Sequence, residues 1–180
     1  MELLKTQIEG LLILKPQIFI DARGLFFESY NEKTFESLGI LDKFVQDNQS
    51  LSQKGVIRGL HYQKPPFAQA KLVRVIKGAA LDVAVDIRKN SPTYGKYFSI
   101  LLTGENNVQF YLPSGFAHGF VSLEDDTIFA YKCSNFYNKD SEESIIYNDP
   151  ILNIDWQTNK PIVNDKDRKA QSFVDFVSPF

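Results

Sequence analysis

Cysteine and histidine are scarce in this sequence. Cys133 is the one cysteine, and His61 and His118 are the two histidines. A lone cysteine excludes an internal disulfide, which fits a reducing compartment such as the cytoplasm. Two histidines without a cysteine pair also argue against a structural zinc site, because such a site takes four ligands of these kinds.

Long apolar runs and an excess of basic charge are missing as well. No stretch approaches the roughly 20 apolar residues that a membrane span needs. The run MELLKTQIEGLLILKPQ is interrupted by Glu2 and Glu9 and lacks the basic start of a signal peptide. At a net charge of -2, the chain has no strong basic field for nucleic acid. We therefore expect a cytoplasmic protein that binds neither membrane nor nucleic acid.

The sequence is rich in short apolar and aromatic runs that are separated by turns. Its hydrophobic fraction is 43%, with 15 Phe and 8 Tyr, which suffices for a core. In KLVRVIKGAALDVAVDIR the alternation indicates strands, and Lys77-Gly78 predicts a tight hairpin turn. The centre, from about Val56 to Tyr137, is therefore typical of an all-β sandwich or jelly roll. NEKTFESLGI and KDRKAQSFVDF predict short peripheral helices, and no linker divides residues 1–180.

Each histidine lies among glycine and aromatic neighbours, in VIRGLHYQ and GFAHGF. A histidine alone is more often a hydrogen-bonded structural residue than a catalyst. Because side chains alternate between the faces of a strand, Arg58 and His61 share a cavity only if the strand bulges between them. Gly59 permits such a bulge. Gln63 stands where metal-binding jelly rolls carry the second histidine of a His-x-His pair, so a metal held by both histidines and one carboxylate is a minor alternative.

Four basic residues, Arg23, Arg58, Lys71 and Arg74, lie near expected strand ends or turns. They are either solvated edge residues or a binding site for a diphosphate. Neither GxxxxGK[ST] nor GxGxxG occurs, so any nucleotide must be held by side chains. Tyr131 is either a core residue or a general acid. The absence of GxSxG gives no support to a serine hydrolase.

Several longer runs occur in the same order in a known family. They are DARGLFFESY, QDNQS, VIRGLHYQKPPFAQAKLVRVIKG, DVAVDIRKNSPTYGK, LPSGFAHGF, YKCSNFYN and YNDP, between about residues 16 and 168. With them the chain resembles the dTDP-4-dehydrorhamnose 3,5-epimerase family, and H-Y-Q-x-P-P-x-A-Q and P-x-G-F-A-H-G-F are the most specific runs. The resemblance implies a cupin-type jelly roll, a homodimer, and neither cofactor nor metal. It also implies an isomerase that acts on a dTDP-sugar in dTDP-L-rhamnose synthesis.

The resemblance implies roles for individual residues. His61 matches the family's general base, and Asp167 matches the carboxylate that pairs with it. Tyr131 matches the proton donor on the opposite face, and Lys71 matches the cation beside the sugar carbonyl. The positions that match substrate contacts are Arg23, Glu28, Gln46, Asn48, Arg58, His118, Glu142, Lys166 and Tyr137.

Two further expectations come from the resemblance. Arg23 and Glu28 belong to an amino-terminal arm, residues 1–50, whose strands the family exchanges between subunits. They would therefore reach the neighbouring subunit's site. Phe136 replaces a tyrosine of the pair that helps to contact the nucleotide, which leaves Tyr137 as the residue to stack on the base.

The expected chemistry explains why a base and an acid occur together. A ketone at carbon 4 acidifies the protons on carbons 3 and 5, and inversion needs a base on one face and an acid on the other. Neutral imidazole suits this task because histidine ordinarily titrates near about 6.5, and a carboxylate behind it fixes its tautomer. Two alternatives stay open. One is a single-site 3-epimerase or ketoisomerase on another 4-keto sugar nucleotide, and the other is a catalytically silent cupin that binds sugar nucleotides.

Overall fold

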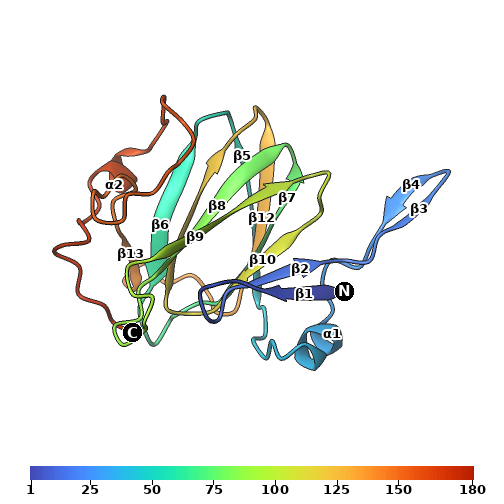
Figure 1. Cartoon of the computed structure of the whole chain (residues 1–180), viewed down its shortest axis with the longest axis horizontal. Helices are drawn as coiled ribbons and strands as arrows, with labels where there is room; N and C mark the ends of the chain where they lie inside the picture. The colour runs from blue at the N-terminus through green and yellow to red at the C-terminus, as the bar shows by residue number, and fades with distance from the viewer.

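The computed structural model describes residues 1–180, which form mainly antiparallel strands packed as two sheets (Figure 1). The strands are β1 (Glu2–Lys5), β2 (Leu12–Lys15), β3 (Phe19–Asp21), β4 (Gly24–Phe26), β5 (Gln46–Ser52), β6 (Ile57–Gln63), β7 (Lys71–Lys77), β8 (Ala79–Asp86), β9 (Tyr97–Thr103), β10 (Gln109–Leu112), β11 (Phe116–Ser122), β12 (Thr127–Cys133) and β13 (Glu142–Ser144). The helices are α1 (Glu32–Ser37) and α2 (Asp165–Arg168). The larger sheet has the order β1-β2-β10-β7-β12-β5, and the smaller has the order β13-β6-β11-β8-β9. The all-β sandwich expected from the sequence is confirmed.

Consecutive strands often lie in different sheets, as a jelly roll requires. Strand β7 pairs with β10 and β12, whereas β8 pairs with β9 and β11. The predicted hairpin at Lys77-Gly78 is therefore wrong, because Gly78 is a corner at which the chain leaves one sheet for the other. Its φ is +78°, and a Cβ there would lie 2.6 Å from Thr127 Oγ1. Both facts require glycine at this corner.

Strand alternation sorts side chains between the interior and the outer faces of the sandwich. In β8, Val83 and Val85 point outward, whereas Ala80 and Ala84 belong to the cluster between the sheets. The other buried members of that inner cluster are Ile8, Leu11, Val73, Val75, Leu102, Phe110, Leu112, Phe116, Phe120 and Phe129. This apolar packing fixes the spacing of the two sheets and therefore the width of the cleft described below.

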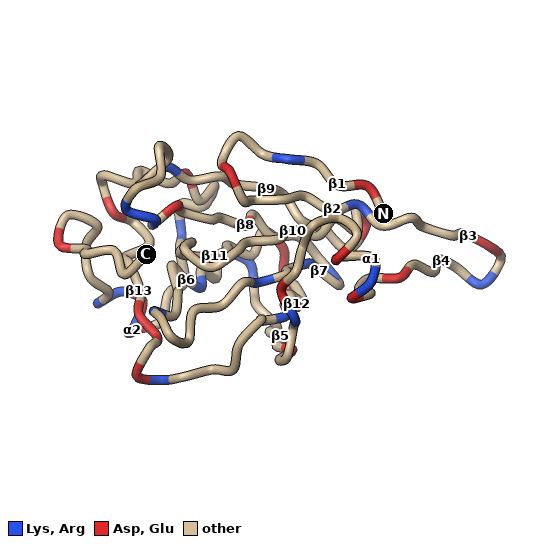
Figure 2. Tube along the Cα trace, turned by 90° about the horizontal axis from the view of Figure 1, so that it is seen from below, with Lys and Arg blue, Asp and Glu red and all other residues tan.

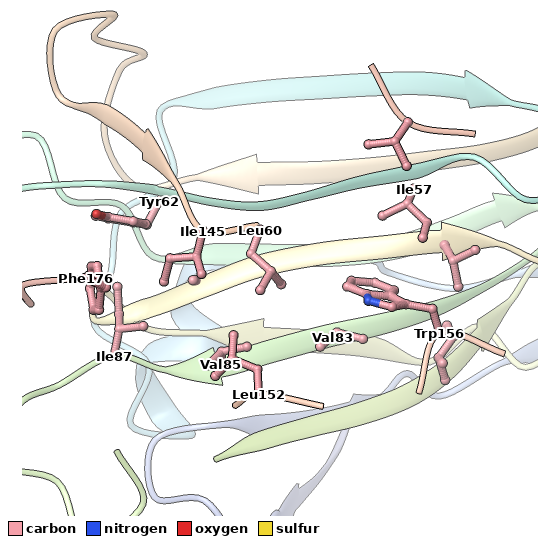
Figure 3. Packing of buried hydrophobic residues seen from close by; sticks show 14 residues of the cluster. Ile57, Leu60, Tyr62, Val83, Val85, Ile87, Ile145, Leu152, Trp156 and Phe176 are labelled. Atoms are coloured by element: carbon pink, nitrogen blue, oxygen red, sulfur yellow. The ribbon is translucent and has the colours of Figure 1, made fainter. Parts of the chain in front are cut away.

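The segment after β13 covers the outer face of the smaller sheet (Figure 3). Its side chains Ile145, Leu152, Trp156 and Phe176 pack with outward residues of β6 and β8. Trp156 is 6% exposed and donates its indole N–H to the Tyr147 carbonyl at 2.7 Å. Trp156 therefore anchors the segment after β13 to the smaller sheet.

Helix α2 is shorter than the helix that KDRKAQSFVDF predicts. It ends at Arg168, and the chain then turns into a single β-bridge between Ile145 and Gln171. The Ile146 N–H donates to the Gln171 carbonyl at 2.9 Å, and this hydrogen bond holds the backbone around Gln171 in an extended conformation. A tertiary hydrogen bond therefore overrides the local helical preference here.

The amino-terminal residues form a hairpin and a capped helix. Helix α1 is the helix expected in NEKTFESLGI, where the Asn31 side chain accepts from the first backbone N–H groups and Phe35 is buried. The β3–β4 hairpin projects away from the sandwich in Figure 1. Figure 2 shows acidic and basic residues interspersed along the chain, with one of each sign at the hairpin tip. No helix has the length and hydropathy needed to span a membrane.

Candidate active site

A polar cleft opens between the two sheets near β5 and β6. It has two adjoining parts, of about 350 Å³ and about 360 Å³. Both parts are lined by Asn48, His61, Lys71, Tyr131 and Glu142. These residues come from strands of both sheets, so the cleft lies in the mouth of the jelly roll and each sheet supplies one wall.

A β-bulge in β6 brings Arg58 to the same face as His61. The two residues between them in β6 lie opposite the single residue between Phe120 and His118 in β11. The extra residue reverses the alternation, so both Arg58 and His61 line the cleft. The condition that the sequence set for Arg58 and His61 to share a cavity, a bulge between them, is therefore met.

Glycine makes this bulge possible. Gly59 has a φ of +143°, a region that other residues rarely adopt. A Cβ at position 59 would lie 2.5 Å from the Cα of Gly119 on β11. Ile57 and Leu60, on either side of Gly59, remain in the outer apolar cluster. The bulge is thus fixed by close backbone approach on one side and by core packing on the other.

His61 is paired with Asp167 across the edge of the sheet. Its Nε2 lies 2.7 Å from Asp167 Oδ1, and the carboxylate is fully buried. The other oxygen, Oδ2, accepts the Gly59 N–H at 3.2 Å. Because an ionised carboxylate only accepts, the imidazole donates from Nε2 and keeps its free lone pair on Nδ1. The His61 side chain is 29% exposed and lines both parts of the cleft.

Asp167 is itself held by the cap of α2. The Asn164 side chain accepts the Asp167 N–H at 2.7 Å, as an N-cap does. Asn164 also lines the cleft. The sequence analysis missed Asn164, although an asparagine three residues before a candidate aspartate is a recognisable capping signal.

The opposite wall carries Lys71 and Tyr131. The Lys71 ammonium lies 6.0 Å from the centre of the Tyr131 ring, and neither polar group has a hydrogen-bond partner within the chain. Burial lowers the pKa of Lys71, while the charges of Cys133, Asp82 and Glu142 oppose that shift. Burial raises the pKa of Tyr131, so it is a protonated phenol at neutral pH. This wall therefore presents the Lys71 amine and the Tyr131 phenol to the cleft.

A second histidine–aspartate pair lies deeper in the same cleft. His118 Nε2 is 2.8 Å from Asp82 Oδ2, and the side chains are 8% and 0% exposed. Burial lowers the pKa of His118 against the pull of the Asp82 charge. Asp82 Oδ1 is buried without a hydrogen-bond partner. The sequence analysis missed Asp82, whose signal is an acidic residue on the inward side of the apolar strand LDVAVDI.

Three of the predicted substrate-binding residues meet at the rim of the cleft. Glu142 accepts hydrogen bonds from Tyr137 Oη at 3.0 Å and from Lys166 Nζ. Burial alone would raise the pKa of Glu142, but the hydrogen bonds from Lys166 and Tyr137 outweigh it and lower that pKa. Gln46, on β5, accepts the Tyr137 N–H at 2.9 Å. Gln46, Asn48, Tyr137 and Glu142 line the cleft beside His61, and Lys166 contacts it only through Glu142.

The remaining basic and acidic candidates lie outside the cleft. Arg23 is at the hairpin tip, where it pairs with Asp21 at 2.6 Å. Glu28 accepts from Asn31 Nδ2 at 3.0 Å. Within one chain, therefore, neither Arg23 nor Glu28 reaches the cleft. No group of three or more His, Cys, Asp or Glu side chains is arranged to hold a metal ion.

Arg74 does not share a site with Lys71. The two residues are three apart in β7, and their pairing with β12 is unbroken, so they point to opposite faces. The Arg74 guanidinium instead lies 5.7 Å from the Phe27 ring, on the outer face. The hypothesis that Arg74 belongs to a diphosphate site with Lys71 is wrong for this reason.

The fold and the cleft define a cupin-type jelly roll with titratable side chains on two facing walls. The family model for dTDP-4-dehydrorhamnose 3,5-epimerase matches residues 5–175. A Shigella flexneri protein of that name is 51% identical over 176 residues, covering 97% of each chain. The chain belongs to the dTDP-4-dehydrorhamnose 3,5-epimerase family, and it is an isomerase of the carbohydrate epimerase type.

Solved structures agree with this assignment. The Legionella pneumophila dTDP-6-deoxy-D-glucose-3,5-epimerase in complex with dTDP-4-keto-L-rhamnose has a TM-score of 0.94 and 49% identity, covering 98% of this chain and 94% of that one. A 3'-monoepimerase from Streptomyces bikiniensis, in complex with dTDP-quinovose, has a TM-score of 0.89 and 34% identity, covering 94% and 86%. The fold is therefore similar to that of both double and single epimerases.

Proposed function

We propose that this protein inverts carbons 3 and 5 of dTDP-4-dehydro-6-deoxy-D-glucose to give dTDP-4-dehydro-L-rhamnose, in the synthesis of dTDP-L-rhamnose. One observation carries the assignment of roles. The buried Asp167 holds His61 on one wall of the cleft, while Tyr131 and Lys71 line the other wall. An epimerase needs this division, because the proton leaves one face of the sugar and returns to the opposite face.

His61 acts as the base in this proposal. Its Nδ1 takes the proton from the carbon next to the ketone, since Nε2 is already engaged with Asp167. The Asp167 carboxylate keeps the imidazole in this tautomer and stabilises the imidazolium that forms. Positioned proton transfer of this kind contributes about 10²–10⁴-fold to a rate.

Lys71 and Tyr131 complete the reaction from the opposite wall. The Lys71 ammonium stabilises the negative charge that develops on the ketone oxygen when the proton leaves. The protonated Tyr131 phenol then returns a proton from the opposite face of the ring, after which the ketone reforms with inverted stereochemistry. The same pair serves carbon 3 and carbon 5 in turn, which requires the sugar ring to rotate between the two inversions.

The rest of the cleft binds the nucleotide part of the substrate. Arg58 supplies a planar guanidinium for the diphosphate, next to His61 on the bulged strand. Tyr137 supplies an aromatic face for the base, and His118 supplies a neutral imidazole near the sugar. The other contacts in this proposal are those of Gln46, Asn48, Glu142 and Lys166.

We also propose that residues 1–180 form one cytoplasmic domain that works as a homodimer. The β3–β4 hairpin, part of arm 1–50, exposes Phe19, Ile20, Leu25 and Phe26 with nothing in its own chain to cover them. Apolar side chains exposed together on a projecting hairpin are typical of an interface. Docking of the hairpin on a second copy would bring Arg23 and Glu28 to the partner's cleft.

Solvent labelling tests the proposed reaction. The protein is incubated with dTDP-4-dehydro-6-deoxy-D-glucose in deuterated water, and the label is mapped by NMR. Deuterium at both carbons 3 and 5 is expected. Deuterium at carbon 3 alone would replace the proposal with a 3-epimerase, and its absence from both carbons would point to a silent binding protein.

Light scattering on the intact chain tests the dimer. The unaltered protein should have twice the mass of one chain, and Ile20→Asp should have the mass of one chain and lower activity. A monomeric mass for the unaltered protein would contradict the exchanged arm.

A further inference from the structure

The run H-Y-Q-x-P-P-x-A-Q contains two glutamines, Gln63 and Gln69, that the proposed reaction does not use. We propose that these two residues act together with Gln46 as positioning residues for the nucleotide, by holding the backbone of residues 134–138 at the mouth of the cleft. We call the three side chains the glutamine clamp. The inference rests on the proposed function, because it takes the ligand to be a nucleotide.

The glutamine clamp contacts four successive residues of this segment. Each contact joins a side-chain amide to a backbone group, so the contacts fix the path of the chain whatever its side chains are. The hydrogen bonds run from Gln69 Nε2 to the Asn135 carbonyl (2.7 Å), from Gln63 Nε2 to the Phe136 carbonyl (3.2 Å), from the Tyr137 N–H to Gln46 Oε1 (2.9 Å) and from the Asn138 N–H to Gln63 Oε1 (2.7 Å).

Gln63 is the centre of the clamp. It is 5% exposed, and its Nε2 makes a second hydrogen bond, to the Phe67 carbonyl at 2.7 Å. Both amide hydrogens and the amide oxygen are therefore used. Carbonyls only accept and the Asn138 N–H only donates, so the orientation of the Gln63 amide is fixed by its partners. Removing this amide would take the hydrogen-bond partner from three backbone groups, the Phe67 and Phe136 carbonyls and the Asn138 N–H.

The clamp spans both sheets. Gln46 lies on β5 at the edge of the larger sheet, and Gln63 lies on β6 in the smaller sheet. The segment that they hold therefore bridges the two walls of the cleft at its opening. Gln63 also stands two residues after His61 on one strand, so the held segment has a fixed position relative to the proposed base.

The held segment presents aromatic rings beside the cleft. Phe136 and Tyr137 are 63% and 56% exposed, and Tyr137 lines the cleft. A ring that is already held in place loses less conformational freedom when a base stacks on it, and the sequence has no glycine-rich phosphate loop to fix the nucleotide otherwise. The clamp supplies that rigidity through the backbone. We therefore assign to it the affinity for the nucleotide and not the proton transfer.

Neutral variants of the clamp test this assignment. Gln63→Leu and Gln69→Leu remove the amides without adding charge. Gln53→Leu is the matched control, because Gln53 is an exposed amide that bonds to Asp126 outside the cleft. Calorimetry with dTDP alone should show a Kd raised about tenfold or more in both clamp variants. Deuterium incorporation from solvent at saturating sugar nucleotide should stay within about twofold of the unaltered protein.

Hydrogen exchange separates a local effect from a general one. In the clamp variants the amides of Tyr137 and Asn138 should exchange faster, while the amides of β8 stay protected. Unchanged dTDP affinity in both variants would overturn the proposal, and so would an affinity loss accompanied by equal loss of protection in β8. If Gln63→Leu does not fold, the same affinity and exchange measurements on Gln69→Leu test the proposal, because Gln69 is only half-buried. Failure of the unaltered protein to label carbons 3 and 5 while binding dTDP would contradict the proposed reaction alone.

Discussion

Two histidine–aspartate pairs lie side by side, with both histidines in the smaller sheet, and the histidines differ in their exposure. His61 and His118 are direct partners in the pairing of β6 with β11. Their distances to Asp167 and Asp82 are 2.7 Å and 2.8 Å, and both carboxylates are fully buried. The His61 side chain is 29% exposed, whereas that of His118 is 8% exposed. Similar pairs are thus placed for different tasks.

The difference comes from where each carboxylate lies. Asp167 belongs to α2 in the covering segment, so it holds His61 from the edge and leaves the other ring nitrogen to the cleft. Asp82 belongs to β8, the strand next to β11, so it holds His118 within the sandwich, where burial lowers the pKa of the imidazole. A carboxylate outside the barrel therefore leaves its histidine partly exposed to the cleft, while one inside the barrel keeps its histidine buried.

The largest effect on this comparison is expected from Asp167→Asn. The amide no longer holds the proton of His61 on Nε2, and the imidazolium loses its counter-charge. The rate of deuterium incorporation at saturating substrate should fall on the order of 10²–10⁴-fold. Asp82→Asn is the matched variant, which should stay within about tenfold of the unaltered rate while lowering Tm. Equal rate losses in the two variants would contradict the assignment of different roles to the two histidine–aspartate pairs.

Lys71→Met should reduce the rate on the order of 10²–10³-fold, because the developing oxyanion loses its cation. The same change should stabilise the fold by about 0.5–2 kcal/mol at pH 7, since a cation that burial disfavours is removed. The pKa of Lys71 is lowered in the folded state, so the unaltered protein should gain stability as pH rises through that value toward about 10.5. Denaturation by urea across this range checks the sign. A less stable Lys71→Met variant at pH 7 would contradict it.

Tyr131→Phe should separate the two halves of the reaction. Without the phenol the base still removes protons, but the opposite-face return is lost. Product formation should therefore fall about 10²-fold, while deuterium exchange into the unreacted substrate falls less. NMR that follows both species in one sample makes the measurement. A parallel fall of the two signals would show that the phenol takes part in proton removal.

The sequence predicted the architecture and the bulge because both depend on local patterns. Alternation along the strands defined an all-β sandwich, and the need to bring Arg58 and His61 together pointed to Gly59. The turn at Gly78 was misread because a glycine between two alternating runs is also a hairpin signal. Which sheet a strand joins depends on distant partners, here β10 and β11, and a local pattern does not contain them.

The candidate site was predicted in part for a similar reason. Most residues that line the cleft were found through motifs. Asp82 and Asn164 were missed because their part in the site depends on contacts in space, with His118 and Asp167 respectively. Arg74 was misplaced although the alternation rule applied to Arg58 and His61 would have put it opposite Lys71. Gln63 was considered only as a missing metal ligand, because the chain segment that it holds lies 73 residues further along.

The smallest expected effect concerns the cap that positions Asp167. Asn164→Ala removes the acceptor for the Asp167 N–H and should lower stability by about 1 kcal/mol. The rate should fall by about tenfold or less, because the His61–Asp167 pair loosens but persists. Asn164→Ser, which retains a capping oxygen, should restore both stability and rate. A rate unchanged by Asn164→Ala would show that the pair is held without the cap.

The most direct test of the account compares His61→Asn with His118→Asn in deuterated water. Both variants replace an imidazole on adjacent strands with the same amide, and both are measured at saturating dTDP-4-dehydro-6-deoxy-D-glucose. We expect His61→Asn to abolish deuterium incorporation at carbons 3 and 5, and His118→Asn to retain it at both carbons with a raised KM. Incorporation that persists in His61→Asn and disappears in His118→Asn would contradict the assignment of the base.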